Sequence, residues 1–484
     1  MRPVVIGFGL LALVAGCGST SADAGPAAGG AAGAAGYGGA AGAAGAGGAA
    51  GMGGGAGAAG SAGASPTDDT LWAHRGDGSG GVRAVTAGGG GRVVVVGAFE
   101  GSIDFGAGVM TSAGGNDMFV ASFDAQGNCV WSRRFGGSKD DAANVVAMDE
   151  TGIVYVSGAF QETMSVGDAA VLTGAGSYDV PLIVLDGDGK VLRAERYGGP
   201  GGDIAFGIDV RDGVVALIGE SGGPISFGGA TLSGVESSFV AAHTTAGAHV
   251  FSRMFDELSV ESVAIDPTGH IAIGGSFNDP TDLGTGPMTP VASTDGFVAR
   301  LKPTGETLFA HRIGDGSTVF GYSVATGPTS DIVFAGMAQS QGKPESFVQL
   351  ERVTSEGKVV WNKKLGAADY AAANSVAVDA ADNVIIGGLV RDGVVDLGCG
   401  PHTVVADPES SYAGDVLVAK LDPAGTCVWS KVFGPAGMQF AAGVAIDDLN
   451  RVSVGGYFQQ SIDFGQGPMV ATHPAEPFLA TFAP

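Results

Sequence analysis

The chain has 484 residues, of which 88 are glycine, 45% are hydrophobic and only 15% are charged. This composition excludes a charged disordered protein and a mostly helical one, and it favours short apolar strands joined by glycine turns. The formal net charge of −25 argues against a nucleic-acid partner, because phosphate binding needs a clustered basic face.

The first residues have the pattern of a secretory signal. Arg2 precedes an apolar run from Val4 to Val14, which is too short to span a bilayer, and small residues follow. The sequence Leu-Val-Ala-Gly-Cys that ends at Cys17 resembles the bacterial lipobox. This resemblance implies cleavage before Cys17 and several acyl chains on it, which together form a lasting membrane anchor. The alternative is an ordinary signal peptide with a cysteine there by chance. We therefore expect a lipoprotein signal at 1–16 and an exported protein, anchored in the bacterial cell envelope at the outer membrane or cell surface.

Residues 17–69 are expected to form a stalk. From Ala24 to Ala64 the chain is almost entirely alanine and glycine, with no apolar stripe that a helix could bury. Each glycine costs a helix about 1 kcal/mol, so a flexible coil is favoured, with an end-to-end distance on the order of 40 Å. Such a stalk would hold the remaining domain, 70–484, clear of the membrane.

A unit of about 60 residues recurs seven times in this domain. Its clearest element is an apolar run that ends in glycine, such as RVVVVG at 92–97, and that is apolar on both faces like a strand buried between two sheets. Another strand precedes this run across an Asp-x-x-Gly turn, and two more follow it, as at 117–124 and 129–136. The aligned glycines are Gly97, Gly158, Gly219, Gly275, Gly336, Gly388 and Gly456.

These repeats predict an all-β fold, a seven-bladed β-propeller with four antiparallel strands in each blade. Seven third strands are followed by only six fourth strands, but TLWAHR at 70–75 matches the fourth strand TLFAHR at 307–312 at five of six positions. Pairing of this N-terminal strand with the last blade would close the ring. An open solenoid would instead need capping repeats. We expect the propeller to be a monomer.

The repeat also resembles that of a known family. Its pattern is Phe-Val-Ala-x-Phe/Leu-Asp, a four-residue turn, Trp-Ser-x-x-Phe-Gly-Gly, and then Val-Ala-x-Asp before the strand that ends in glycine. This pattern is similar to the bacterial surface β-propeller repeat called SBBP over residues 70–484, with a weaker match around Arg193, where the usual tryptophan is absent. The resemblance implies a propeller at the cell surface, and it supplies no catalytic residues.

Propeller winding should place the fourth-to-first and second-to-third connections on one face, so ligand sites are expected there, around the channel mouth. An acidic residue recurs in the fourth-to-first connections. A ring of carboxylates would suit Ca²⁺ or another hard cation, yet no loop has a calcium signature, and solvated turn acids explain the same residues. The acids of this possible cation or ligand rim are Asp77, Asp140, Asp141, Asp203, Asp256, Asp315 and Asp369.

Besides Cys17 there are three cysteines, which allow at most one internal disulfide. Cys129 and Cys427 share a repeat position in blades that are not adjacent, so they are too far apart to bond. Cys399 lies in the long loop of the sixth blade and is the candidate partner of Cys427 in the same blade. The repeat-equivalent His74 and His311 are expected to cover the surface rather than bind metal. The four tryptophans share one repeat position and are expected to pack between blades rather than to stack on sugars.

Ser-Ile-Asp-Phe-Gly occurs at 102–106 and again at 461–465. In protein kinases Asp-Phe-Gly holds magnesium, but a kinase also needs a Gly-rich phosphate loop, a paired lysine and a His-Arg-Asp loop. A segment repeated in several blades lacks that context. We therefore expect a loop element whose phenylalanine is buried and whose glycine turns the chain.

The sequence favours a non-catalytic function: a lipid-anchored propeller of the cell envelope that displays its loop face to a protein or glycan. One alternative is a hydrolase or lyase that acts on polysaccharides through the rim carboxylates, although no nucleophile elbow or Ser/His/Asp set presents itself. Another is a structural envelope protein without a specific ligand. No cofactor is expected apart from the possible Ca²⁺.

Overall fold

The computed structural model describes residues 69–234, 236–404, 414–434 and 437–484. Cys17, the expected signal and nearly all of the expected stalk lie outside the described residues. Within the described residues the regular secondary structure consists of strands and one short 3₁₀ turn, Gly89–Gly91. The same residues contain no helix of the length and hydrophobicity needed to cross a bilayer.

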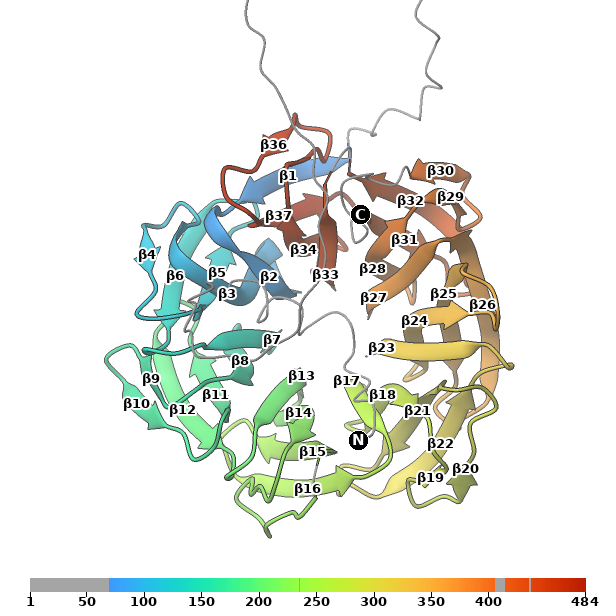
Figure 1. The fold of residues 1–484 in the computed structure, drawn as a ribbon, viewed down its shortest axis with the longest axis horizontal. Coiled ribbons are helices and arrows are strands. Elements are labelled where there is room, and N and C mark those ends of the chain that lie inside the picture. The colour runs from blue at the N-terminus through green and yellow to red at the C-terminus, as the bar shows by residue number, and fades with distance from the viewer. Residues whose placement is uncertain (1–68, 235, 405–413, 435–436) are drawn as a thin grey trace, which may run out of the picture. The chain divides into compact units, whose positions relative to one another are not determined.

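Seven antiparallel sheets are arranged around a central axis, which confirms the seven-bladed β-propeller (Figure 1). The innermost strands are β2 (Asp77–Gly88), β7 (Ala142–Met148), β13 (Asp203–Arg211), β17 (Ser259–Ile265), β23 (Thr318–Thr326), β27 (Tyr370–Val378) and β33 (Gln439–Ile446). The second strands are β3 (Arg92–Asp104), β8 (Val154–Ala159), β14 (Val214–Ser221), β18 (Ile271–Phe277), β24 (Ile332–Gln339), β28 (Val384–Arg391) and β34 (Val452–Phe458). The third strands are β5 (Asp117–Phe123), β11 (Val180–Leu185), β15 (Ser237–Thr244), β21 (Asp295–Leu301), β25 (Ser346–Val353), β31 (Asp415–Leu421) and β37 (Glu476–Phe482). The outermost strands are β6 (Cys129–Phe135), β12 (Val191–Tyr197), β16 (His249–Phe255), β22 (Thr307–Ile313), β26 (Val359–Ala368), β32 (Cys427–Phe433) and β1 (Thr70–Arg75).

The N-terminal strand closes the ring, as the repeat count predicts. β1 pairs antiparallel with β37, with Trp72 opposite Thr481 and Arg75 opposite Phe478, and it forms the outer edge of blade 7 (Figure 1). The last blade is therefore assembled from both ends of the described chain. This pairing replaces the two open edges of a solenoid with a continuous ring.

The strand directions give the ring two different faces. First and third strands start on the face where the fourth-to-first and second-to-third connections lie, and this face carries short strand pairs, so we call it the hairpin face. The opposite face, which we call the turn face, carries the tight turns between first and second and between third and fourth strands. The added strands of the hairpin face are β4 (Met110–Thr111), β9 (Thr163–Val166), β10 (Ala170–Thr173), β19 (Thr281–Asp282), β20 (Pro287–Met288), β29 (Gly393–Asp396), β30 (Pro401–Val404), β35 (Ser461–Ile462) and β36 (Met469–Val470).

The aligned glycines of the repeat face a β-bulge in the neighbouring innermost strand. In β7 the unpaired residue is Asn144, and a Cβ built on Gly158 of β8 would lie only 2.0 Å from the carbonyl oxygen of Ala142. The corresponding distance is 1.8 to 2.0 Å for all seven glycines. The 60-residue glycine spacing thus records where each innermost strand bulges. The bulged residues are Arg83, Asn144, Phe206, Glu261, Tyr322, Asn374 and Ala442.

Aromatic side chains of the outermost strands pack between blades, as expected for the tryptophans. The Trp131 indole lies against Gly189 in the turn of the next blade, where a Cβ would come within 2.6 Å of the ring, and its Nε1 donates to the Gly187 carbonyl at 2.9 Å. The Trp72 ring likewise lies against Gly127. These rings are therefore part of the interface between blades.

Candidate binding surface on the hairpin face

The Asp-Phe-Gly segments are turns of the hairpin face. Oδ1 of Asp104 accepts hydrogen bonds from the amides of Gly106 at 2.7 Å and Gly108 at 3.2 Å. The same pair of bonds recurs in blades 4, 6 and 7, where the sequence is also Asp-x-Gly-x-Gly. The residue after the aspartate is buried in each of these four turns. The aspartate is thus a turn-forming residue, and no catalytic role is needed to explain it.

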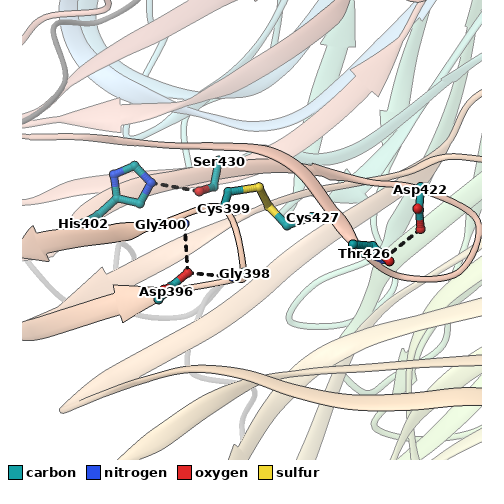
Figure 2. Close-up of a disulfide and its surroundings, with 9 residues drawn as sticks. All are labelled: Asp396, Gly398, Cys399, Gly400, His402, Asp422, Thr426, Cys427 and Ser430. Carbon is teal, nitrogen blue, oxygen red and sulfur yellow. Dashed lines mark hydrogen bonds between the residues drawn. A yellow bond between two sulfur atoms is a disulfide. The ribbon is translucent and has the colours of Figure 1, made fainter.

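Three of these four turns, in blades 4, 6 and 7, are fastened to the outermost strand of their own blade. In blades 7 and 4 the first residue of that strand is a threonine, and the hydroxyls of Thr70 and Thr307 donate to main-chain carbonyls of the turn at 2.5 Å. In blade 6 the equivalent residue is Cys427, which forms a disulfide with Cys399 with a Cα–Cα distance of 5.5 Å (Figure 2). The structure therefore joins the two cysteines that the sequence pairs, and it leaves Cys129 as a free thiol.

A second device, which the sequence reasoning missed, anchors the other end of the hairpins. Asp179, the residue before β11, is buried, and it accepts from the Ala175 amide at 2.8 Å and from the Arg196 guanidinium at 2.7 Å. Blades 1, 4 and 7 repeat this arrangement with a buried acid and an arginine of the outermost strand. The sequence could have revealed these pairs, because an acidic residue recurs at the start of the third strand and an arginine recurs as the sixth residue of the fourth strand. The pairs are Asp117–Arg134, Asp179–Arg196, Asp295–Arg312 and Glu476–Arg75.

Two of the predicted rim acids are buried. Oδ2 of Asp141 accepts from the Gly137 amide at 2.7 Å, and Oδ1 accepts from the Gln161 amide at 3.2 Å. Burial raises the pKa of Asp141 to about 7. Asp203 likewise accepts from the Gly199 amide at 2.8 Å and from the Ser221 hydroxyl, and burial raises its pKa. These two carboxyl groups hold connections together instead of facing a ligand.

The other five rim acids have separate partners. Asp140 accepts from the main-chain and side-chain amides of Asn116 at 2.9 and 3.1 Å. The other four are exposed, and each has a nearby partner. Asp256 accepts a hydrogen bond from the Ser237 hydroxyl. The remaining ion pairs are Asp315–Lys364, Asp369–Arg391 and Asp77–Arg75. The structure thus does not gather the seven acids into one cluster.

Asp77 does approach two other potential metal ligands. Its carboxylate, His473 and Glu476 each place one ligand atom within 4.8 Å of the others, the single such group of three within the described chain. Arg75 lies in the same place, with Nη1 2.9 Å from Glu476 Oε2 and Nη2 3.5 Å from Asp77 Oδ1. Glu476 Oε1 also accepts from the Thr472 amide at 2.9 Å. The arginine therefore already supplies the positive charge between these carboxylates.

The innermost strands and two second strands, β14 and β34, carry a mixed group of aromatic and charged side chains near the axis. Arg83, at the bulge of β2, donates to Asn144 Oδ1 in the next blade at 2.7 Å, and burial lowers its pKa to about 10, so it stays charged at neutral pH. Burial and the nearby Glu261 raise the pKa of Glu220 to about 7. The half-buried members of this group, which we call the axial group, are Arg83, Glu220, Glu261, Tyr322, Tyr370 and Tyr457.

Exposed aliphatic side chains add to this surface. Valines in the second-to-third connections of five blades are 55 to 68% exposed, whereas no Phe, Tyr or Trp of the described residues is exposed. Val470, Val109 and Val171 belong to the consecutive blades 7, 1 and 2 (Figure 1). The remaining two are Val291 and Val394.

The two repeat-equivalent histidines have separate surroundings. The His74 ring packs against Phe105 and Phe123. His311 lies in a pocket of about 330 Å³ on the outer strands of blades 4 and 5, with Nε2 2.6 Å from Glu351 Oε1. Glu351 also accepts from Asn362 Nδ2. These polar groups are therefore paired with one another.

Comparison with known proteins adds distant likenesses. No family model matches the chain. The regulatory protein FlaEY of Caulobacter vibrioides is 26% identical in an alignment of 306 residues. The alignment covers 56% of this chain, and the chain spans about a third (31%) of that relative. Among solved structures, the Dos1 propeller (10% identity, TM-score 0.44) and the WD40 propeller domain of Doa1 (11%, 0.43) each match over 85% of this chain and 96% of their own. Puromycin hydrolase (15% identity, TM-score 0.41) matches over 82% of this chain and 55% of its own. The strand pairing of the chain itself establishes its fold as a seven-bladed β-propeller.

Proposed function

We propose that this protein is a non-catalytic binding scaffold of the bacterial cell envelope, and that its hairpin face binds a partner protein. The observation that carries the proposal is the axial group, in which tyrosines, an arginine and two glutamates are half-buried around the axis. Tyrosine and arginine are the residues that most often dominate the binding energy of protein interfaces. The hairpins around this group carry exposed valines, which form an apolar rim. Because the hairpins are fastened to their blades, this rim has a fixed shape, and a preformed surface loses less entropy on binding.

A protein partner is favoured over a glycan because the described surface has no exposed aromatic ring on which a sugar could stack. The rim carboxylates give little support to catalysis, since each is hydrogen-bonded or ion-paired within or beside its own connection. The relative FlaEY is named a regulatory protein. A regulatory role through binding is compatible with such a surface.

Immobilised protein and envelope extract test the binding surface. We expect the intact chain to retain one or a few proteins, and Tyr370→Ala, at the hairpin-face end of β27, to reduce their retention at least about tenfold, the usual loss at an aromatic hot spot. Leu449→Ala, an exposed residue of the turn face, is the matched control and should retain them fully. Equal retention by Tyr370→Ala, or no retained protein at all, would contradict the proposal.

Membrane attachment through Cys17 is a separate part of the proposal. The wild-type protein should enter the detergent phase and incorporate labelled palmitate, whereas Cys17→Ser should do neither, because several acyl chains are needed for stable anchoring. A wild-type protein that stays in the aqueous phase would rule out the anchor without affecting the binding surface.

A further inference from the structure

A pocket on the turn face marks the place where the sevenfold repeat is broken. It has a volume of about 580 Å³ and lies between blade 2 and the turns of blade 3. This size falls within the range of small-molecule sites in proteins. Its walls include Ile153, Tyr155, Val184, Leu192 and Arg193.

The pocket exists because blade 2 lacks an aromatic ring that every other blade has. The third residue of the outermost strand is aromatic in the other six blades and Arg193 in blade 2. Arg193 Nη1 donates to the Thr245 carbonyl of the next blade at 3.1 Å, just as Trp131 Nε1 donates to Gly187. The arginine therefore keeps the hydrogen bond between blades and leaves out the ring. The six aromatic residues are Trp72, Trp131, Phe251, Phe309, Trp361 and Trp429.

The charge of the outermost strand is also reversed in blade 2. The fifth residue is basic or histidine in the other six blades, and Arg133 in blade 1 lies 5.6 Å from the centre of the Trp131 ring. In blade 2 this residue is Glu195, with Oε1 3.3 Å from Arg193 Nε. Asp149 and Glu150 line the pocket, and Glu195 contacts the Arg193 side chain that lines it, so its surroundings are acidic.

The pocket also has an apolar floor and one hydrogen-bond donor without a partner. Ile153 and Val184 stand at the repeat positions that hold Arg92 and Ser122 in blade 1, so the floor is apolar. Nη2 of Arg193 is buried and has no hydrogen-bond partner in the described part of the chain. A buried donor without a partner is destabilising, and a ligand with an acceptor would remove this penalty.

We infer that this pocket binds a ligand with an uncharged aromatic ring, and that a positive charge and a carbonyl group lie on the chain attached to this ring. The ring would take the place that an indole or phenyl ring fills in the other six blades, and would stack on the Arg193 guanidinium. The carbonyl would accept from Nη2, and the carboxylates of Asp149, Glu150 and Glu195 would attract the positive charge. Two kinds of ligand share this chemistry. One is a free amine with an aromatic side chain, and the other is a partner peptide in which an aromatic residue stands beside a basic residue. The inference does not depend on the hairpin face.

Three tryptophan derivatives that differ in charge test it by calorimetry on the full chain. We expect L-tryptophan amide, a cation, to bind at least about tenfold more tightly than the anion N-acetyl-L-tryptophan, with L-tryptophan between them. Equal affinities, or no binding of any derivative, would overturn the inference. The peptide acetyl-Lys-Trp-Lys-amide separates the sources: binding at least as tight as the amide's indicates a partner peptide, and weaker binding indicates a free amine.

Two variants show whether binding occurs at this pocket. Arg193→Trp supplies the ring that the other blades have, and it should abolish binding of the amide while leaving the melting temperature unchanged or higher. Glu195→Gln leaves the pocket open and should reduce the preference for the cation at least about threefold. Glu306→Gln, an exposed turn residue of blade 4, is the matched control. Unchanged binding in both pocket variants would show that the ligand binds elsewhere and would overturn the inference.

Discussion

At the scale of single residues, steric contact explains the strongest repeat in the sequence. Gly158 and its six counterparts face a main-chain carbonyl of a bulged innermost strand, and there is no room for a Cβ atom. The bulge in turn turns one residue of each innermost strand towards the next blade, as Arg83 reaches Asn144. The glycines therefore shape the axis without lining it.

Gly158→Ala should destabilise the propeller by at least about 3 kcal/mol, because the new methyl group would overlap the Ala142 carbonyl and force the bulge to shift. Gly89→Ala is the matched control, since no atom lies closer than 4.0 Å to a Cβ built there, and it should change stability by less than about 0.5 kcal/mol. Urea unfolding followed by circular dichroism measures both. Equal stability of the two variants would contradict the steric account.

Asp141 illustrates how burial of one residue makes stability depend on pH. Its pKa is raised from 3.8 to about 7 by burial, so the folded chain keeps a proton that the unfolded chain releases between these values. The contribution of Asp141 is therefore complete below about pH 4 and is lost as the pH rises towards 7. Its hydrogen bonds to two main-chain amides reduce this effect without reversing it.

We expect the free energy of unfolding of the wild type to fall more steeply between pH 4 and 7 than that of Asp141→Asn, by roughly 1 kcal/mol per pH unit. The slopes rather than the absolute stabilities are compared, because an asparagine cannot accept both amide bonds. Urea unfolding at a series of pH values gives the slopes. Parallel slopes would mean that Asp141 is ionised in the folded protein.

At the scale of elements, the same turn recurs on the hairpin face, and different bonds link it to the outermost strand in different blades. In blades 6 and 7 the fourth residue of the Asp-x-Gly-x-Gly turn contacts the first residue of the outermost strand. In blade 6 these are Cys399 and Cys427, and in blade 1 they are Ala107 and Cys129. Cβ atoms built on Gly398 and on Gly106 lie 3.8 and 4.0 Å from the cysteine Cβ of the outermost strand, so the two blades have nearly the same geometry.

Ala107→Cys should therefore form a disulfide with Cys129 without a change of backbone. The chain-entropy model gives a loop of this length about 3 kcal/mol of stabilisation. Peptide mapping under non-reducing conditions identifies the bond, and Ala107→Ser is the control. A Cys129 that still reacts with a thiol reagent after oxidation would show that the two turns are not equivalent.

The sequence predicted elements that depend on repetition and missed features that depend on strand register and on side-chain volume. Strands, ring closure, the Asp-Phe-Gly turn and the Cys399–Cys427 pair all followed from the positions of residues in the repeat. The bulges and the Asp179–Arg196 pair depend on strand register, which the spacing did not reveal. Arg193 was visible as a departure from the repeat, but its pocket depends on the volume that a missing ring leaves.

At the scale of the whole molecule, the ring separates two faces with different roles. The hairpin face gathers the axial group and the five exposed valines of the second-to-third connections, and its rim acids hold their own connections. The turn face is made of short turns, such as the one in which Asp124 accepts from the amides of Gln126 and Asn128, and it opens into a pocket at blade 2. A partner protein on the hairpin face and an aromatic ligand on the turn face could thus bind at the same time.

Photo-crosslinking in intact cell envelopes tests the central claim most directly. A benzoylphenylalanine placed at Val109 or Val470 on the hairpin face should give an adduct with the same partner protein, and Tyr370→Ala should remove both adducts. The same probe at Leu449 on the turn face of blade 7 should give none. Adducts at Leu449 with no adduct at Val109 and Val470, or adducts that Tyr370→Ala leaves unchanged, would contradict a binding surface on the hairpin face.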